Sequence, residues 1–242
     1  MTDSRTARTK GPLPILCYHR VGETGLEGTK HNNPPAQLRK HVDFFSRRGY
    51  EFVRVIDYTL PARGKQVCFT FDDGWKSAVD NGLPLLYDRR LKCTIYLPTD
   101  FVGNPNGLSE NDRGEIGDWN DFKTAMDHGV EVGNHTARHV PLTMLSREDA
   151  LAQVIAAKDS LTQRGFGPHS FCYPGGLVPD FGPSILKAAG YSLAVSLLPG
   201  PASALSDPLC LPRLHMASND SLPRLIYRLF LRRYPSPTKP TS

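Results

Sequence analysis

The amino-acid sequence predicts an α/β fold, built either as a (β/α) barrel or as a doubly wound sheet. Short apolar runs alternate with amphipathic stretches along most of the 242 residues. Most of these runs are short and carry apolar residues on both faces, which is typical of strands buried in a parallel sheet. Polar motifs stand directly after several runs, and in a barrel the carboxyl ends of the strands carry the functional groups.

Eight segments have the composition of buried strands. None approaches the roughly 18 apolar residues that would indicate a membrane span. The predicted strands are Ile15–Val21, Phe52–Ile56, Val67–Phe71, Cys93–Leu97, Val130–Asn134, Ser170–Tyr173, Leu193–Ser196 and Leu209–His215.

Helical patterns separate these strands. Leu38, Val42 and Phe45 form one apolar stripe, and Ser146 is a suitable N-cap with Asp149 three residues on. Glycine follows four of the helices and is the usual residue that ends one. The predicted helices are Pro35–Arg48, Lys76–Arg90, Asp118–His128, Ser146–Arg164 and Pro183–Ala189.

The remaining segments define the organisation of the chain. Residues Gly103–Asp118 are polar and Gly-rich, and we expect a long loop there that lies over the catalytic rim of the sheet. We expect a disordered basic segment at residues 1–12, one domain at residues 13–218, a basic amphipathic helix at residues 219–234 and a disordered tail at residues 235–242.

The predicted C-terminal helix is basic on one side, with Arg224, Arg228 and Arg232 at helical spacing. The net charge of the chain is +5 and its pI is 9.0. One interpretation is a final helix that packs on the domain and exposes a solvated basic face. The other is contact with an anionic membrane surface or a phosphorylated lipid carrier. No motif indicates nucleic-acid binding.

The cysteines and the N-terminus indicate the compartment. The five cysteines are an odd number, show no Cys-x-x-Cys spacing and lie mostly in predicted strands, as buried free thiols do. This favours a reducing environment. The polar N-terminus lacks the apolar run of a secretory signal. We therefore expect a cytoplasmic protein, with possible peripheral contact at the inner membrane face.

Two polar motifs predict a metal-dependent hydrolytic site. Asp72 and Asp73 end one apolar run, and His135 and His139 follow another. Histidines four residues apart lie on one face of a helical turn, which is the geometry we expect here. Two imidazoles and one carboxylate suit Zn²⁺, Co²⁺ or Ni²⁺ with positions left open for water. The second carboxylate can then take a proton from that water.

Each motif also has a purely structural interpretation. An Asp-Asp-Gly sequence after a strand is often only a turn, and a His-x-x-x-His pair on a surface helix is usually without function. Their joint placement after strands of one α/β chain favours the metal site.

These residues resemble motifs of the polysaccharide deacetylases of carbohydrate esterase family 4. The matching segments are Thr70-Phe71-Asp72-Asp73-Gly74, His135-Thr136-x-x-His139 and, for the branch that acts on exopolysaccharides and lipid-linked sugars, Cys17-Tyr18-His19-Arg20. The resemblance implies a distorted (β/α) barrel of seven strands that removes N-acetyl groups with one divalent metal ion. It implies that Asp72 is the general base, that Asp73, His135 and His139 bind the metal, and that Thr136 hydrogen-bonds near the site, to the substrate or to a metal ligand.

A third family motif, Arg-x-Pro-Tyr-Gly, is altered in this chain. Cys172 stands in place of the arginine that orients the base, and Gly175 in place of the tyrosine whose backbone N–H stabilises the oxyanion. Any residue except proline supplies that N–H, so Gly175 can still serve. Arg213 is a candidate to replace the arginine, because its fork geometry can reach a carboxylate. Pro174 and Arg213 are also expected beside the substrate.

The last family motif contributes a histidine as the general acid. His215, at the end of a predicted strand, is the candidate for that role in this chain. His19 is the competing acid or a substrate contact. No motif surrounds His31, His41, His128 or His169, and we expect these four at the surface or at helix ends.

The sequence thus predicts an enzyme that removes an N-acetyl group from an amino sugar in a bacterial glycan or a lipid-linked glycan precursor. Two alternatives stay open. The altered motifs also fit a non-catalytic protein that binds a glycan or a carrier on the same fold. The same chemistry would also serve an O-acetyl esterase or an N-deformylase.

Overall fold

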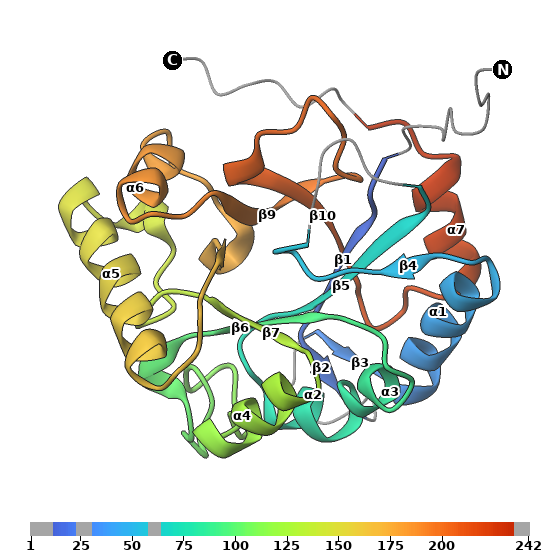
Figure 1. Cartoon of the computed structure of the whole chain (residues 1–242), viewed down its shortest axis with the longest axis horizontal. Coiled ribbons are helices and arrows are strands. Elements are labelled where there is room, and N and C mark those ends of the chain that lie inside the picture. The colour runs from blue at the N-terminus through green and yellow to red at the C-terminus, as the bar shows by residue number, and fades with distance from the viewer. Residues whose placement is uncertain (1–11, 23–30, 58–63, 235–242) are drawn as a thin grey trace, which may run out of the picture.

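Seven parallel strands close into a barrel at the centre of the molecule, and helices surround it (Figure 1). The structure is a computed structural model that describes residues 12–22, 31–57 and 64–234. The barrel strands are β1 (Ile15–Tyr18), β5 (Gln66–Phe71), β6 (Thr94–Leu97), β7 (Glu131–Asn134), β8 (Ser170–Cys172), β9 (Leu193–Pro199) and β10 (Leu211–His215). Strand β1 pairs with both β5 and β10, so the sheet has no free edge there. This closure confirms the seven-stranded barrel and excludes the doubly wound sheet.

Most positions of the barrel strands are buried, because both faces of the sheet are covered. One cluster, which includes Ile15, Cys68, Tyr96 and Val195, fills the interior. Two further clusters lie between the strands and the surrounding helices. Side-chain packing on both sides explains why the strands read as continuous apolar runs rather than as alternating ones.

Three short strands lie outside the barrel and correct the predicted ones. The segment predicted as Ile15–Val21 divides at His19, and its second part, β2 (Arg20–Val21), pairs instead with β3 (Asn32–Asn33). The segment predicted as Phe52–Ile56 is reduced to β4 (Glu51–Phe52), which pairs with the beginning of β5.

The helices lie where the sequence predicts them, with one predicted helix divided into two and the last one shortened. They are α1 (Pro35–Arg47), α2 (Lys76–Asn81), α3 (Pro84–Tyr87), α4 (Trp119–Asp127), α5 (Arg147–Gln163), α6 (Gly182–Ala188) and α7 (Leu222–Phe230). The helix predicted at Lys76–Arg90 is divided into α2 and α3, because Pro84 lacks the N–H that would continue the helix. Ser146 and Asp118 cap α5 and α4, and Asp118 forms a full capping box.

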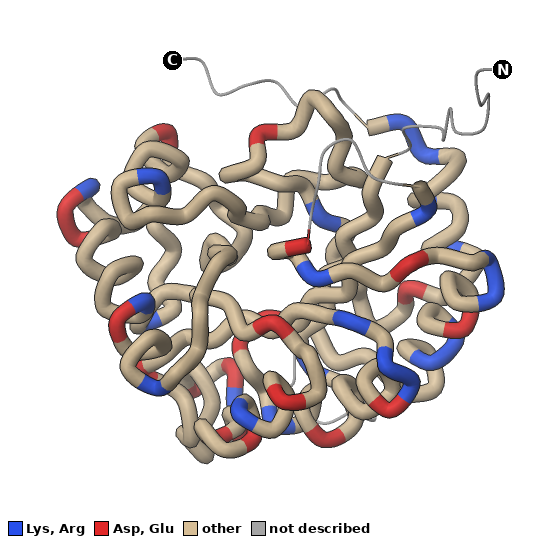
Figure 2. Tube along the Cα trace, in the orientation of Figure 1, with Lys and Arg blue, Asp and Glu red and all other residues tan. Residues whose placement is uncertain are grey.

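Helix α7 is shorter and less basic at its surface than the sequence indicates. Arg224 and Arg228 both form ion pairs with the buried Asp220. Positively and negatively charged residues alternate along the outer segments of the chain (Figure 2). Among the described residues, no helix is long and apolar enough to cross a membrane. Of the regions expected to be disordered, residues 1–11 and 235–242 lie outside the described residues.

Candidate active site

The predicted site residues gather at the carboxyl-terminal rim of the barrel. Asp72 and Asp73 follow β5, and His135 follows β7. The turn Pro174–Gly176 follows β8, and His215 ends β10. Parallel strands that end at one rim bring together groups that lie more than a hundred residues apart in the sequence.

Asp73, His135 and His139 converge on one point. The Nε2 atoms of His135 and His139 lie 3.3 and 3.0 Å from Oδ1 of Asp73. One ligand atom from each of the three residues lies within 4.8 Å of the others. The exposed fraction of the side chain is 2% for His135 and 26% for His139, so the cluster opens to solvent on the His139 side.

This donor set fits a divalent cation. The Nδ1 atom of His135 lies 2.8 Å from the carbonyl oxygen of Cys172, and a carbonyl only accepts, so Nδ1 carries the proton. In the neutral ring Nε2 is then an acceptor, aimed at a carboxylate oxygen that is also an acceptor. That oxygen, Oδ1 of Asp73, is buried and has no hydrogen-bond donor among the described residues. Acceptors that converge in this way are the arrangement that a metal ion satisfies.

The histidine pair does not lie on a helical turn, which corrects the prediction. The chain after β7 forms an irregular turn, in which Thr136 and His139 both have positive φ angles, of 65° and 54°. Asn134 Oδ1 accepts from the N–H of Thr136, and Thr136 Oγ1 accepts from the N–H of His139. These bonds bring the two imidazoles to a centroid distance of 4.8 Å. Because Thr136 is fully buried and holds this turn, it is not placed as a substrate contact.

Arg213 holds Asp72 with both arms of its guanidinium group. Its Nη1 and Nη2 atoms donate to Oδ1 and Oδ2 of Asp72 at 2.7 and 2.6 Å. The thiols of Cys17 and Cys172 lie 3.3 and 3.4 Å from the same Oδ2. Burial acts to raise the pKa of Asp72, but the Arg213 charge and its hydrogen bonds outweigh burial and hold that pKa well below its ordinary range. Asp72 is therefore ionised at neutral pH.

The position of Arg213 explains how the chain tolerates Cys172 in place of an arginine. Arg213 extends from β10 and donates to Asp72, to the hydroxyl of Thr70 and to the carbonyl of Ser196. Its exposed fraction is 1%. Arg213 is thus the hydrogen-bond partner of Asp72, as the sequence indicated, and its expected contact with the substrate stays a prediction.

The turn after β8 presents Gly175 at the rim. Gly175 is exposed and has a φ angle of 64°. A side chain added at Gly175 would meet no atom within 4 Å, so the missing tyrosine leaves open space. Pro174 is buried in the same turn. Pro174 therefore shapes the turn, and its direct contact with the substrate stays a prediction.

Three histidines form a second group beside Asp72. The ring of His215 lies 5.4 Å from that of His19 and 4.8 Å from that of His31, measured between centroids. Nε2 of His215 is buried and makes no hydrogen bond within the part of the chain that the structure describes. Burial, reinforced by the other two histidines, lowers the pKa of His215 to about 4, and burial also lowers the pKa of His19. A ring nitrogen of His19 lies within 4.8 Å of an Asp72 oxygen.

Sequence reasoning missed several of these neighbours. His31 was expected at the surface, and it is exposed, but its ring contacts both His19 and His215. His41, expected at the surface, is buried and lies 2.8 Å from the Tyr18 hydroxyl. Trp75 donates its indole N–H to Asp73 at 3.0 Å. Trp75 was the one of these with a local signal, because it lies two residues after Asp73.

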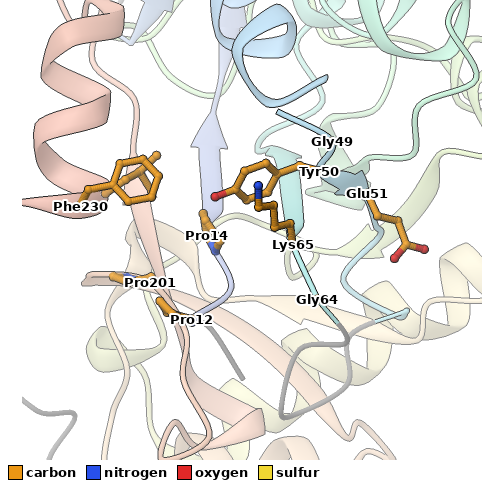
Figure 3. Close-up of a pocket in the computed structure, with 10 residues that line it drawn as sticks. Pro12, Pro14, Gly49, Tyr50, Glu51, Gly64, Lys65, Pro201 and Phe230 are labelled. Atoms are coloured by element: carbon orange, nitrogen blue, oxygen red, sulfur yellow. The ribbon is translucent and has the colours of Figure 1, made fainter. Parts of the chain in front are cut away.

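A separate cleft opens at the opposite end of the barrel (Figure 3). Pro14 and Lys65, which line it, directly precede β1 and β5, whereas Asp72 directly follows β5. Tyr50 and Phe230 face the cleft as well. Its described lining holds no cluster of metal-binding side chains. We therefore assign the chemistry to the carboxyl-terminal rim.

Comparison with known proteins agrees with this geometry. The family model described as polysaccharide deacetylase matches residues 59–194, more than half of the chain and a range that includes Asp72, Asp73, His135 and His139. The chain belongs to the polysaccharide deacetylase family. It is 26% identical over 203 residues to YxkH of Bacillus subtilis (strain 168), which is assigned by name to the polysaccharide deacetylases. That alignment covers 79% of this chain and 66% of the relative's length.

Solved structures share the fold. The deacetylase PplD of Streptococcus pyogenes, solved in complex with acetate, has a TM-score of 0.76 at 23% identity, with 91% of this chain and 99% of that chain covered. IcaB of Ammonifex degensii has a TM-score of 0.73 at 23% identity, with 88% and 95% covered. These likenesses establish the deacetylase barrel for this chain.

Proposed function

We propose that this member of the family is a divalent-metal-dependent hydrolase that removes the N-acetyl group from an amino sugar. The observation that supports this most directly is one rim that holds both a cluster of three metal ligands and a carboxylate kept ionised by Arg213. A metal bound by Asp73, His135 and His139 would lower the pKa of a water molecule and polarise the acetyl carbonyl.

The chain's own groups supply the remaining chemistry. Asp72 accepts the proton of the attacking water, since its carboxylate is ionised and its orientation is fixed by two hydrogen bonds. The backbone N–H of Gly175, on an exposed turn at the rim, would donate to the oxyanion that develops on the carbonyl oxygen. Arg213 acts by holding the base.

The histidine cluster returns the proton to the leaving amine. His215, with its pKa near 4, is neutral at pH 7 and must first receive a proton before it can donate one. His19 lies between the base and His215, within 4.8 Å of Asp72 and with its ring in contact with that of His215. We assign His215 as the acid and His19 as the group that passes the proton from Asp72 or replaces His215 in the role.

The substrate that we propose is an N-acetylated amino sugar of a bacterial glycan or of a lipid-linked glycan precursor on the cytoplasmic side. All five cysteines are buried free thiols, which is consistent with a reducing compartment. Arg232 and Arg233 remain exposed after α7 and are the groups we assign to contact with a phosphorylated carrier at a membrane surface. The replacement of the motif arginine by Arg213 favours catalysis over the non-catalytic alternative.

The test begins with metal content. We expect about one divalent ion per chain in the wild type and none in an Asp73→Ala/His135→Ala variant, measured by elemental analysis. Acetate release from N-acetylated oligosaccharides and carrier-linked sugars follows, with O-acetyl and N-formyl forms of the same sugar as comparisons. Faster release from the O-acetyl or N-formyl form would replace the assignment by an esterase or a deformylase.

Asp72→Asn separates the base from the metal site. The substitution keeps the size of the side chain but removes its basicity, so we expect the variant to bind metal normally and to lose turnover by a factor of about 10² or more. Near-wild-type turnover would contradict the role of Asp72. A metal-loaded wild type that hydrolyses none of these sugars would favour the glycan-binding alternative.

A further inference from the structure

We infer that Trp75 is a positioning residue for Asp73, and that Arg20 and Asp112 hold Trp75 in place by fastening the 103–118 loop over it. The inference rests on the proposed metal-binding role of Asp73. It concerns residues that are not among the proposed metal ligands Asp73, His135 and His139.

The first observation is the hydrogen bond from Trp75 to Asp73. The indole Nε1 donates to Oδ2 of Asp73 at 3.0 Å. This bond engages one carboxylate oxygen and leaves the other, Oδ1, to face His135 and His139. Asp73 has a φ angle of 72°, a strained conformation for a residue with a side chain, and needs such support to keep its orientation. Partners of this kind fix metal ligands in many proteins.

The second observation is the cation above the indole ring. The guanidinium carbon of Arg20 lies 3.3 Å from the centroid of the Trp75 ring. Both residues are buried, with exposed fractions of 4% and 1%. Stacking of a desolvated guanidinium on an indole face is among the stronger cation–π contacts. Arg20 therefore restricts the plane of the ring, and with it the direction of the N–H.

The third observation is the ion pair that anchors Arg20 to the loop. Nη2 of Arg20 lies 2.8 Å from Oδ1 of Asp112. The exposed fraction of the side chain is 5% for Arg20 and 26% for Asp112. A partly buried charge pair of this kind is screened less by solvent than a surface pair.

The loop backbone is fastened to the same segment. Lys76 donates its N–H to the carbonyl of Glu115, and Gly117 donates to the carbonyl of Gly74, at 2.8 and 2.9 Å. Gly114 lies against the stack with a φ angle of 143°, and a side chain there would collide with the Arg20 guanidinium. Glycine is needed at this position both for its φ angle and for the close approach. The loop and the metal-ligand segment therefore form one connected unit.

An alternative is that Trp75 serves only as a large apolar residue of the core, where it packs with Phe122 and Ile116. In that case its N–H would be dispensable. Trp75→Phe separates the two roles, because it retains a buried aromatic ring and removes only the donor and part of the ring area. Trp119→Phe is the matched control, because Trp119 is the only other tryptophan and stacks on Arg164 away from the site.

The experiment measures the Kd of the metal-free full chain for Zn²⁺ and Co²⁺ by competition with a chromophoric chelator. We expect Trp75→Phe to raise Kd by roughly 10- to 100-fold and Trp119→Phe to leave it unchanged. Asp112→Asn should raise Kd by a smaller factor, whereas Glu110→Gln, which removes a charge from the same loop, should not. In the Trp75→Phe background Asp112→Asn should have little further effect, since its influence passes through the ring.

Each outcome bears on a separate claim. A wild-type Kd in a folded Trp75→Phe variant overturns the inference and leaves the proposed function intact. Failure of the wild type to bind either metal overturns both. If Trp75→Phe does not fold, the two loop variants Asp112→Asn and Glu110→Gln provide the test. Equal Kd values of these two variants for the metal would show that the Arg20–Asp112 ion pair does not influence Asp73.

Discussion

At the scale of single residues, Asp72 can act as a base only while it is ionised, and Arg213 controls that ionisation. A carboxylate buried to this extent would otherwise hold its proton. The bidentate contact supplies both the charge and the direction that the family's usual arginine supplies from position 172. The small side chains of Cys17 and Cys172 contact the Asp72–Arg213 pair and leave room for the guanidinium group.

Arg213→Lys tests this control through the pH dependence of kcat/KM. Lysine keeps a positive charge but loses the fork, so we expect the pKa of Asp72 to rise toward its ordinary value. In the wild type the depressed pKa keeps the base ionised as pH falls, and the advantage is lost only below that pKa. The acidic limb of the profile should therefore lie at higher pH in the variant. An unchanged acidic limb, at unchanged metal content, would contradict the role of Arg213.

The histidine cluster is tested by varying the leaving group. An acid matters most for a poor leaving group such as an amine, and least for an activated phenol. We expect His215→Asn to reduce amide hydrolysis by a factor of about 10² to 10⁴ and to affect an aryl acetate much less. If His19 passes the proton, His19→Asn should reduce amide hydrolysis as His215→Asn does. His31→Asn changes an exposed residue and should reduce amide hydrolysis less. Equal losses on both substrates would assign His215 a structural role.

The residues that sequence reasoning found and missed differ in how local their signal is. Asp72, Asp73, His135 and His139 stand in contiguous motifs after strands, so they could be predicted. Arg213 lies 141 residues from Asp72, and no spacing rule connects them; only the absent motif arginine pointed to it. His31 carries no motif, and its contacts with His19 and His215 follow from the closure of the fold.

At the scale of elements, the short connections at the rim determine how the site residues are oriented. The spacing of His135 and His139 equally fits a helical turn and the irregular turn that the structure contains. Hydrogen bonds that the side chains of Asn134 and Thr136 accept from the backbone stabilise the irregular turn. No periodicity in the sequence indicates these bonds. The helices and barrel strands, by contrast, follow local patterns. The differences lie in the break between α2 and α3, the length of α7 and the short strands β2, β3 and β4 outside the barrel.

The turn after β8 offers a test with an internal control. A side chain at Gly176, whose φ angle is 69°, would collide with Leu197, whereas one at Gly175 would meet open space. We expect Gly176→Ala to displace the turn and lower kcat by about 10²-fold. Gly175→Ala keeps the N–H and should cost only about 1–2 kcal/mol of stability, with kcat close to wild type. Metal content should stay unchanged in both, and equal kcat values would argue against the oxyanion role of the turn.

At the scale of the whole molecule, the site exists only when the barrel is closed. Its groups come from β1, β5, β7, β8 and β10, which are assembled by parallel pairings between distant segments. Sequence patterns predicted the strands but not their closure, because a barrel and a doubly wound sheet share the same local signals. The resemblance to a family, rather than the periodicity, predicted seven strands.

Because the ligands lie on the loops after β5 and β7, a metal that binds them stabilises the folded barrel and has no preformed site in the unfolded chain. At a free metal concentration 100 times Kd the gain is about 2.7 kcal/mol. For a domain of this size we expect Tm to rise by about 5–10 °C, measured by calorimetry or circular dichroism. The Asp73→Ala/His135→Ala variant should show no rise. An equal rise in the variant would place the bound metal elsewhere, and no rise in the wild type would remove the metal from the proposed function.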